Sequence, residues 1–153
     1  MLRLIPPPLH RQLYRLAYFM RRRWLRLRGG TMHGCILIAR DDRGGVLLVR
    51  HSYGSGSWQL PGGGVGRKEQ PEHAIRREIA EELGCEVRDL ASLGTVEQNY
   101  HGATNVVHVF TGGLNGWPQA DGRELVKVRF FPADALPARM AASVRQQLEL
   151  AGI

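Results

Sequence analysis

Glu78, Glu81 and Glu82 are spaced so that they fall on one face of a helix expected over residues 71–83. Residues three and four apart in a helix are neighbours, and like charges there repel by roughly a few tenths of a kcal/mol per pair. A hard divalent cation offsets this repulsion, because carboxylate oxygens are preferred ligands of Mg²⁺ and Mn²⁺. The spacing therefore indicates a metal-binding helical face, although a solvated acidic face is the commoner fate of such a run.

The residues before and within the helix favour the metal-binding interpretation. Gly62, Gly63 and Gly64 precede the helix, and glycine lets backbone approach a ligand closely. Glu69 lies in the loop between these glycines and the helix, and Arg77 adjoins the acidic run. Such a pair could join the loop to the helix through a charge-assisted hydrogen bond. The segment thus combines a close-approach loop, a cross-link and three potential metal ligands.

This segment resembles the signature of the Nudix family, G-x5-E-x7-R-E-U-x-E-E-x-G-U, in which U is a bulky aliphatic residue. The fixed positions are matched by Gly63, Glu69, Arg77, Glu78, Ile79, Glu81, Glu82 and Gly84. Cys85 stands at the last aliphatic position, where a small apolar side chain can still pack. So long a match is a strong signal, unlike a short glycine pattern. The likeness covers about residues 31–150.

The resemblance implies roles for the matched residues. The family's metal ligands correspond to three carboxylates and one backbone carbonyl, those of Glu78, Glu81, Glu82 and Gly62. Glu69 and Arg77 correspond to the structural salt bridge of the signature, which is called the box. Gly66 and Lys68 depart from residues common in close relatives. These departures bear on the number of metal ions and on substrate preference, and not on the fold.

The base that activates water is Glu78 or a glutamate outside the box in different members of the family. Outside the box, Glu124 is the favoured candidate, because it lies at the start of a late strand after a long loop. Glu97 and Asp121 are the other candidates. The expected catalytic residues are therefore Glu78, Glu81, Glu82 and Glu124.

The substrate would need groups that hold phosphate. A pyrophosphate repels a nucleophilic water, and bound cations neutralise its charge and lower the pKa of bound water. Candidates to hold the remaining phosphate are Arg50, His51 and Lys68, with a solvated surface role as an equal alternative. The backbone of Gly63 and Gly64 could also approach it.

A base or sugar of the substrate would need an apolar or aromatic surface to pack against. The aromatic residues nearest the glycine loop in sequence are Tyr53, Trp58 and Tyr100, and core packing is the stronger expectation for Trp58. Asn99 and Asn105 could contact the edge of a base, but turn and capping roles are as common for asparagine. The sequence does not select among a nucleotide, a nucleotide sugar or a similar compound.

Strand and helix patterns predict one α/β (α+β) domain over residues 31–153. Apolar runs predict strands at 34–40, 46–50, 58–60, 93–100, 105–111 and 124–131. The first two are expected to form a hairpin, because residues 41–45 have turn chemistry. Pro71 and Gly84 suit the ends of a helix over 71–83, and a second helix is expected over 139–150. The resemblance implies a Nudix-like α/β/α sandwich, with a mixed sheet between helices.

Residues 1–30 are expected to form a separate basic arm, because they contain eight arginines and no acidic residue. A stripe at spacings of three and four predicts an extra amphipathic helix over residues 9–28, formed by Leu9, Leu13, Leu16, Met20, Trp24 and Leu27. The stripe is expected to pack on the domain or on a second subunit in a homodimer. The alternatives are contact of the helix with an anionic membrane surface or with the phosphates of a nucleic acid.

The remainder of the chain is nearly neutral, so the net charge of +7 does not indicate a nucleic-acid-binding domain. No apolar run is long enough to span a bilayer, and arginines interrupt any secretory signal. Cys35 and Cys85 are expected to be buried, reduced thiols, which favours a cytoplasmic location.

These features predict an enzyme, a pyrophosphohydrolase that uses Mg²⁺ (or Mn²⁺). Its expected reaction is hydrolysis of a pyrophosphate linkage in a small nucleoside diphosphate derivative. The alternative is a non-catalytic Nudix-fold module that binds a nucleotide, with the basic arm contacting a partner or a membrane. Retention of Glu78, Glu81 and Glu82 favours the enzyme, because a binding module does not need three adjacent ligands.

Overall fold

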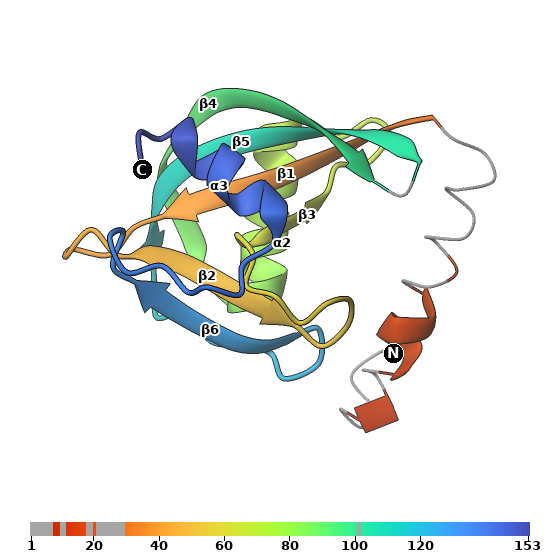
Figure 1. Ribbon diagram of the computed structural model, residues 1–153, viewed down its shortest axis with the longest axis horizontal. Helices are drawn as coiled ribbons and strands as arrows, with labels where there is room; N and C mark the ends of the chain where they lie inside the picture. The colour runs from red at the N-terminus through yellow and green to blue at the C-terminus, as the bar shows by residue number, and fades with distance from the viewer. Residues whose placement is uncertain (1–7, 10–11, 18–19, 21–29, 101) are drawn as a thin grey trace.

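The computed structural model describes residues 8–9, 12–17, 20, 30–100 and 102–153. Figure 1 shows the elements of the domain, which are β1 (Thr31–Ala39), β2 (Val46–His51), β3 (Gly62–Gly64), α2 (Pro71–Leu83), β4 (Glu86–Tyr100), β5 (Ala103–Asn115), β6 (Leu125–Phe131) and α3 (Ala142–Glu149). Among the described residues, no helix is long and apolar enough to cross a membrane.

The strands form two sheets. Four of them lie in the order β3-β1-β5-β4, and β1 runs parallel to β5 but antiparallel to β3. β2 and β6 form a separate antiparallel pair. The larger sheet is therefore mixed, as predicted.

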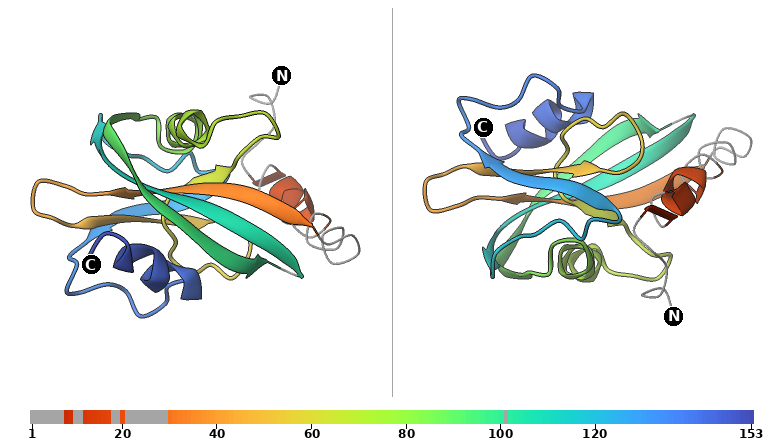
Figure 2. Two further views of the ribbon diagram at one scale, coloured as in Figure 1. Left: turned by 90° about the horizontal axis from the view of Figure 1, so that it is seen from above. Right: turned by 90° about the horizontal axis from the view of Figure 1, so that it is seen from below.

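Helices cover both sides of the sheets, with α2 on one side and α3 on the other (Figure 2). Leu37 of β1 packs in the core cluster that includes Ile75 and Ile79 of α2. The next residue, Ile38, packs in the cluster that includes Val144 of α3, because successive strand residues point to opposite faces. This alternation confirms the predicted α/β/α arrangement.

The predicted hairpin of residues 34–40 and 46–50 is wrong in its pairing. β1 and β2 meet at an isolated bridge between Arg40 and Val46, and then continue into different sheets. The turn itself forms, with the Gly45 amide donating to Asp41 Oδ1 at 2.7 Å. The residues of the turn reverse the chain direction, but they do not determine which strand pairs with β1.

Several element boundaries also differ from the prediction. Residues 58–60 form isolated bridges at Trp58 and Gln59, and the regular strand is the glycine segment β3. β4 begins at Glu86, earlier than the predicted start at residue 93, and passes through two irregularities in its pairing with β5. The antiparallel pairing of β4 with β5 also continues to Asn115, beyond the end of the strand predicted over residues 105–111.

Residues 8–9, 12–17 and 20 are helical, in agreement with part of the predicted helix over 9–28. Trp24 and Leu27 of that prediction lie outside the described residues. The described members of the stripe are 45% to 61% exposed, and they are Leu9, Leu13, Leu16 and Met20. This part of the stripe is therefore exposed in the single chain and does not show the expected packing on the domain. Tyr14 and Arg15 make the contacts with the domain instead. Packing on a second subunit stays a prediction.

Candidate active site

The glutamates of helix α2 lie on two sides of the helix, one buried and one exposed. The helix ends where the sequence predicts, because Gly84 adopts the left-handed conformation with φ of 66°. Ile79 faces the core, and Glu82, three residues later, shares that buried side. The Glu81 side chain is 63% exposed. The three box glutamates thus differ in environment although they share one helix.

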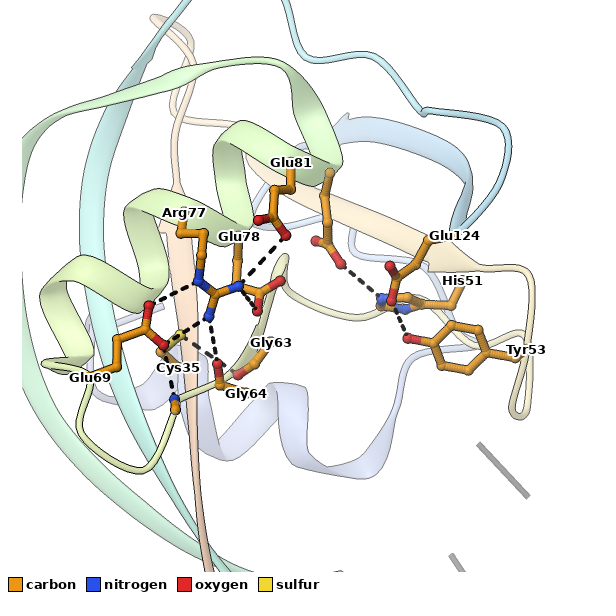
Figure 3. A network of polar contacts seen from close by, with 12 residues as sticks. Cys35, His51, Tyr53, Gly63, Gly64, Glu69, Arg77, Glu78, Glu81 and Glu124 are labelled. Carbon is orange, nitrogen blue, oxygen red and sulfur yellow. Dashed lines mark hydrogen bonds and ion pairs between the residues drawn. The ribbon is translucent and has the colours of Figure 1, made fainter. Parts of the chain in front are cut away.

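Arg77 joins the loop to the helix (Figure 3). Its guanidinium donates to both carboxylate oxygens of Glu69, at 2.9 Å and 3.0 Å, which is a bidentate arrangement. It also donates to the Gly64 carbonyl at 3.1 Å and to Glu78 Oε1 at 2.7 Å. A single side chain therefore fixes the loop, the glycine strand and Glu78 relative to one another, and it also lies 3.6 Å from the Glu81 carboxylate.

The two carboxylates that accept hydrogen bonds from Arg77 have pKa values shifted in opposite directions. Hydrogen bonds from Arg77 and then from the Gly66 amide lower the pKa of Glu69 to about 2. Burial raises the pKa of Glu78, and this effect exceeds the opposing effect of Arg77. The exposed cross-link therefore stays charged at low pH, whereas Glu78 is a more basic carboxylate.

The glycine strand β3 leaves room for close approach to α2. Gly62 has a φ of 150°, and a Cβ atom there would lie 2.8 Å from the Cα of Ile36. A Cβ atom at Gly63 would lie 2.6 Å from both carboxylate oxygens of Glu78. Side chains at these positions would collide with β1 and with the acidic face respectively. The glycines thus allow the strand and the box carboxylate to lie in contact.

A second polar cluster lies beside the box and joins α2 to the smaller sheet. His51 Nε2 lies 3.5 Å from Glu82 Oε1, and Glu124 completes a group whose potential ligand atoms all lie within 4.8 Å of one another. Burial raises the pKa of Glu82 to about 7. The side chains of Glu82 and His51 are 4% and 9% exposed, and Glu82 Oε2 has no hydrogen-bond partner among the described residues.

The position of Glu124 is fixed by several hydrogen bonds. Its carbonyl accepts a hydrogen bond from the Ser52 amide at 2.8 Å, and its own amide donates to Asp121 Oδ1 at 3.0 Å. The Tyr53 hydroxyl donates to Glu124 Oε1 at 2.8 Å (Figure 3). Glu124 thus faces the cluster from the residue before β6, held by the loop after β2.

The other two candidates for the base lie in different surroundings. Asp121 accepts hydrogen bonds from three successive amides, those of Arg123, Glu124 and Leu125, so it caps the turn before β6. Glu97 is exposed on β4, and its neighbour Gln98 lines the cavity on the opposite face of the strand. The structure therefore brings Glu124, and neither of these two, to the box.

A cavity of about 390 Å³ opens next to the cluster. His51 of the cluster lines it, as does Tyr53, which donates a hydrogen bond to Glu124. Gly63 and Gly64 line it from β3. Four residues with amide side chains line it, and they are Gln59, Gln98, Asn105 and Gln147. A pocket of this size, with a few convergent polar groups, is typical of a small-molecule site.

Several residues expected near the substrate lie elsewhere. Trp58 packs edge-on against Phe131 with ring centroids 4.9 Å apart, and Arg50 lies over the Trp58 ring. Neither lines the cavity. Lys68 is exposed in the loop before α2.

One further candidate is accounted for by its position in the hairpin between β4 and β5. Asn99 accepts a hydrogen bond from the Gly102 amide, which is a turn role. The side chain of Tyr100 lies outside the described part of the chain.

The sequence interpretation missed four contributors to this region. Gln147 follows Val144 by three residues on the buried stripe of α3, and a polar residue on such a stripe could have been noticed. Tyr14 lies with its ring 6.2 Å from that of Tyr53, and Arg15 Nε donates to the Ser52 carbonyl at 3.0 Å. Burial and then the charge of Glu124 raise the pKa of Tyr14. These contacts and the place of Gln98 carry no local sequence signal.

Comparison with known proteins agrees with this geometry. A family model of the NUDIX domain matches residues 32–151. The chain belongs to the Nudix hydrolase family. A MutT NUDIX hydrolase from Burkholderia pseudomallei has a similar structure, with a TM-score of 0.73 and 29% identity over 78% of this chain and 97% of that one. Residues 1–31 lie outside the matched Nudix domain.

Named relatives of the Nudix domain are enzymes that act on phosphoric anhydride bonds. A Mycobacterium tuberculosis protein provisionally named 8-oxo-dGTP diphosphatase 2 is 44% identical, over 69% of this chain and 79% of its own length. An RNA pyrophosphohydrolase of Saccharophagus degradans is 39% identical over 61 residues. That match covers 40% of this chain. The matched part spans about a third (36%) of the relative's own length.

Proposed function

We propose that this Nudix hydrolase cleaves a pyrophosphate linkage in a nucleoside di- or triphosphate, or in a compound linked to one, with Mg²⁺ or Mn²⁺. The observation that carries the proposal is the position of the cavity directly beside the box carboxylates. His51 of the cluster lines the cavity, and so does Tyr53, which donates a hydrogen bond to Glu124. A ligand that fills the cavity therefore brings its phosphates to α2.

The cavity walls suit a nucleobase. Gln98, Asn105 and Gln147 each offer a donor and an acceptor, which match the edge of a base. Gln147 is buried, and Gln98 Nε2 is buried without a hydrogen-bond partner among the described residues. A buried amide without a partner is costly, so a ligand that bonds to it gains affinity. This favours a nucleotide over an inorganic or purely sugar-linked pyrophosphate.

The residues present suit a hard divalent cation. Glu78, Glu81 and Glu82, with the carbonyl of Gly62, would hold it, since oxygen ligands are those that Mg²⁺ and Mn²⁺ prefer. The unpartnered Glu82 Oε2 and the close packing of Gly63 under Glu78 support this assignment. Such an ion neutralises phosphate charge and lowers the pKa of a bound water.

In this proposal the protein's own residues position the ions and move one proton. Arg77 holds Glu78 and the glycine strand, so it fixes the carboxylate against the loop. Glu124 accepts a proton from the attacking water, and Tyr53 orients its carboxylate. The water oxygen bonds to phosphorus as the bridging phosphorus–oxygen bond breaks and the second phosphate leaves. We favour Glu124 as base because Glu78 is already bound by Arg77.

A product-release assay tests the proposal with Mg²⁺ and with Mn²⁺. The substrates are a panel of nucleoside triphosphates, nucleotide sugars and dinucleoside polyphosphates. The variants Glu81→Gln and Glu82→Gln should each abolish turnover while the far-UV circular dichroism spectrum stays unchanged. Glu72→Gln is the matched control, since Glu72 is exposed in the first turn of the same helix. Undiminished turnover in both box variants would overturn the assignment.

A further inference from the structure

We infer that His51, Glu82 and Glu124 form a mixed nitrogen–oxygen site that binds a divalent first-row transition metal more tightly than Mg²⁺. The inference deepens the proposed function, because Glu82 is shared with the box. It adds an imidazole ligand, which comes from outside α2. The ligands come from three places in the fold, the end of β2, the last turn of α2 and the residue before β6.

The separation of the ligand atoms suits a metal ion better than a direct hydrogen bond. His51 Nε2 and Glu82 Oε1 are 3.5 Å apart. A charge-assisted hydrogen bond between such groups is shorter, about 2.7–2.9 Å. Two ligands with bonds of about 2.1 Å to one tetrahedral ion lie about 3.4 Å apart. The observed spacing therefore leaves room for an ion between the imidazole and the carboxylate.

Burial supplies a second, independent indication of a ligand. The Glu82 side chain is 4% exposed, and its Oε2 atom has no hydrogen-bond partner among the described residues. Glu124 brings another carboxylate into the same group. A buried carboxylate without a full set of partners is unfavourable, and two together repel each other. A bound dication would supply the missing coordination and the opposite charge.

Surrounding residues orient two of the three ligands. The Tyr53 hydroxyl donates to Glu124 at 2.8 Å, and the Tyr53 ring lies 5.0 Å from the His51 ring (Figure 3). The Ser52 amide holds the Glu124 backbone. Such outer contacts commonly fix the direction of metal ligands. Ligation needs one oxygen of Glu124, and the other, which accepts the Tyr53 hydrogen bond, has a second lone pair for the proton-accepting role proposed above.

The chemistry of the ligands sets the class of metal. Imidazole suits the later first-row ions, whereas Mg²⁺ prefers oxygen ligands and octahedral geometry. For a nitrogen–oxygen site, affinity rises from Mn²⁺ through Co²⁺ to Ni²⁺ and Cu²⁺. One histidine with two carboxylates should therefore bind Co²⁺ or Zn²⁺ more tightly than Mg²⁺. Co²⁺ is the most informative probe, because its visible absorption reports its ligands.

The test is a titration of the full chain with Co²⁺ alone, followed by visible absorption and by calorimetry. His51→Gln should lower Co²⁺ affinity by about tenfold or more and change the absorption bands, and it should leave Mg²⁺ affinity unchanged. Glu124→Gln should also weaken Co²⁺ binding. His73→Gln is the control, because His73 is exposed on α2 outside the cluster. Thermal melting of each variant checks that it folds.

The possible results separate the two proposals. Co²⁺ binding by His51→Gln that equals wild-type binding would overturn the mixed site, and the box assignment would stand if nucleotide hydrolysis persisted. His51-dependent Co²⁺ binding in a protein that hydrolyses no substrate of the panel would support the mixed site and overturn the proposed function. Equal loss of Co²⁺ and Mg²⁺ affinity in His51→Gln would also contradict the inference. The inference states that His51 favours a transition metal over Mg²⁺.

Discussion

The Glu78 carboxylate packs against the α-carbon of Gly63, so that a Cβ atom at residue 63 would lie 2.6 Å from both of its oxygens. Gly63→Ala should therefore displace the carboxylate and leave the backbone in place, because the obstructing atoms are the end of a side chain. A displacement of about 1 Å can cost on the order of a hundredfold in rate. We expect a loss of that order in kcat, measured by product release.

The control for this prediction is Gly113→Ala. The added Cβ atom would meet the Arg88 guanidinium at 2.8 Å, but Arg88 is an exposed side chain that can move. Its melting temperature and kcat should remain near wild type. An equal loss of kcat in both variants would show that the effect is not specific to Glu78.

The Glu69–Arg77 pair should make the stability of the folded chain depend on pH in the acid range. The pKa of Glu69 is about 2 in the folded chain, below its ordinary value of 4.5. The unfolded chain therefore takes up this proton first, so the stabilising contribution is present above about pH 4.5 and is lost as the pH falls towards 2. The difference in urea midpoint between wild type and Glu69→Gln should shrink over that interval.

Glu86→Gln serves as the comparison for the acid prediction, since Glu86 is exposed at the start of β4. Its midpoint should follow that of wild type across the same range. A constant gap between wild type and Glu69→Gln from pH 5 to pH 2 would contradict the prediction.

Tyr14 should influence turnover although it lies outside the matched Nudix domain. Its ring lies beside Tyr53, which holds Glu124. Tyr14→Ala should raise KM and lower kcat by up to about tenfold. The melting temperature should not change, because none of the residues described before β1 belongs to a core cluster. Leu13→Ala changes an exposed neighbour and should have no effect. Similar kinetics for both variants would rule out a specific role for Tyr14.

Both cysteines should resist modification in the folded protein. Cys35 and Cys85 are free and buried, and burial raises the pKa of the Cys35 thiol to about 11. The reactive thiolate at Cys35 is therefore scarce at any pH well below 11. A thiol reagent at pH 8 should react slowly with native protein and rapidly with both cysteines in denaturant. Fast reaction in the native state would contradict the burial of these side chains.

The sequence predicted the parts of the fold whose causes are local. Helix α2 begins at Pro71 and ends at Leu83 as expected, because proline suits a first helical turn and Gly84 can adopt the left-handed conformation. Ile75 and Ile79 are buried on one side of this helix, as residues four apart on a helix share a face. Strand pairing was not predictable, because the turn after β1 is compatible both with a hairpin and with the divergence observed.

The candidate site shows the same limit. Glu78, Glu81 and Glu82 could be recognised together because they share one helix. His51 was expected only as a phosphate-binding residue, and its proximity to Glu82 depends on how β2 packs beside α2. No spacing rule relates residues so far apart in the chain. The Tyr53–Glu124 hydrogen bond was unforeseen for the same reason.

The wide sequence separation of His51, Glu82 and Glu124 links metal supply to folding. An unfolded chain cannot bring these three side chains around one ion, so an ion bound there shifts the equilibrium towards the native state by mass action. At a free concentration of 100 times Kd, that shift is worth about 2.7 kcal/mol. A chelator would then lower the melting temperature as well as stopping turnover, and starvation for the metal would expose the chain to proteolysis.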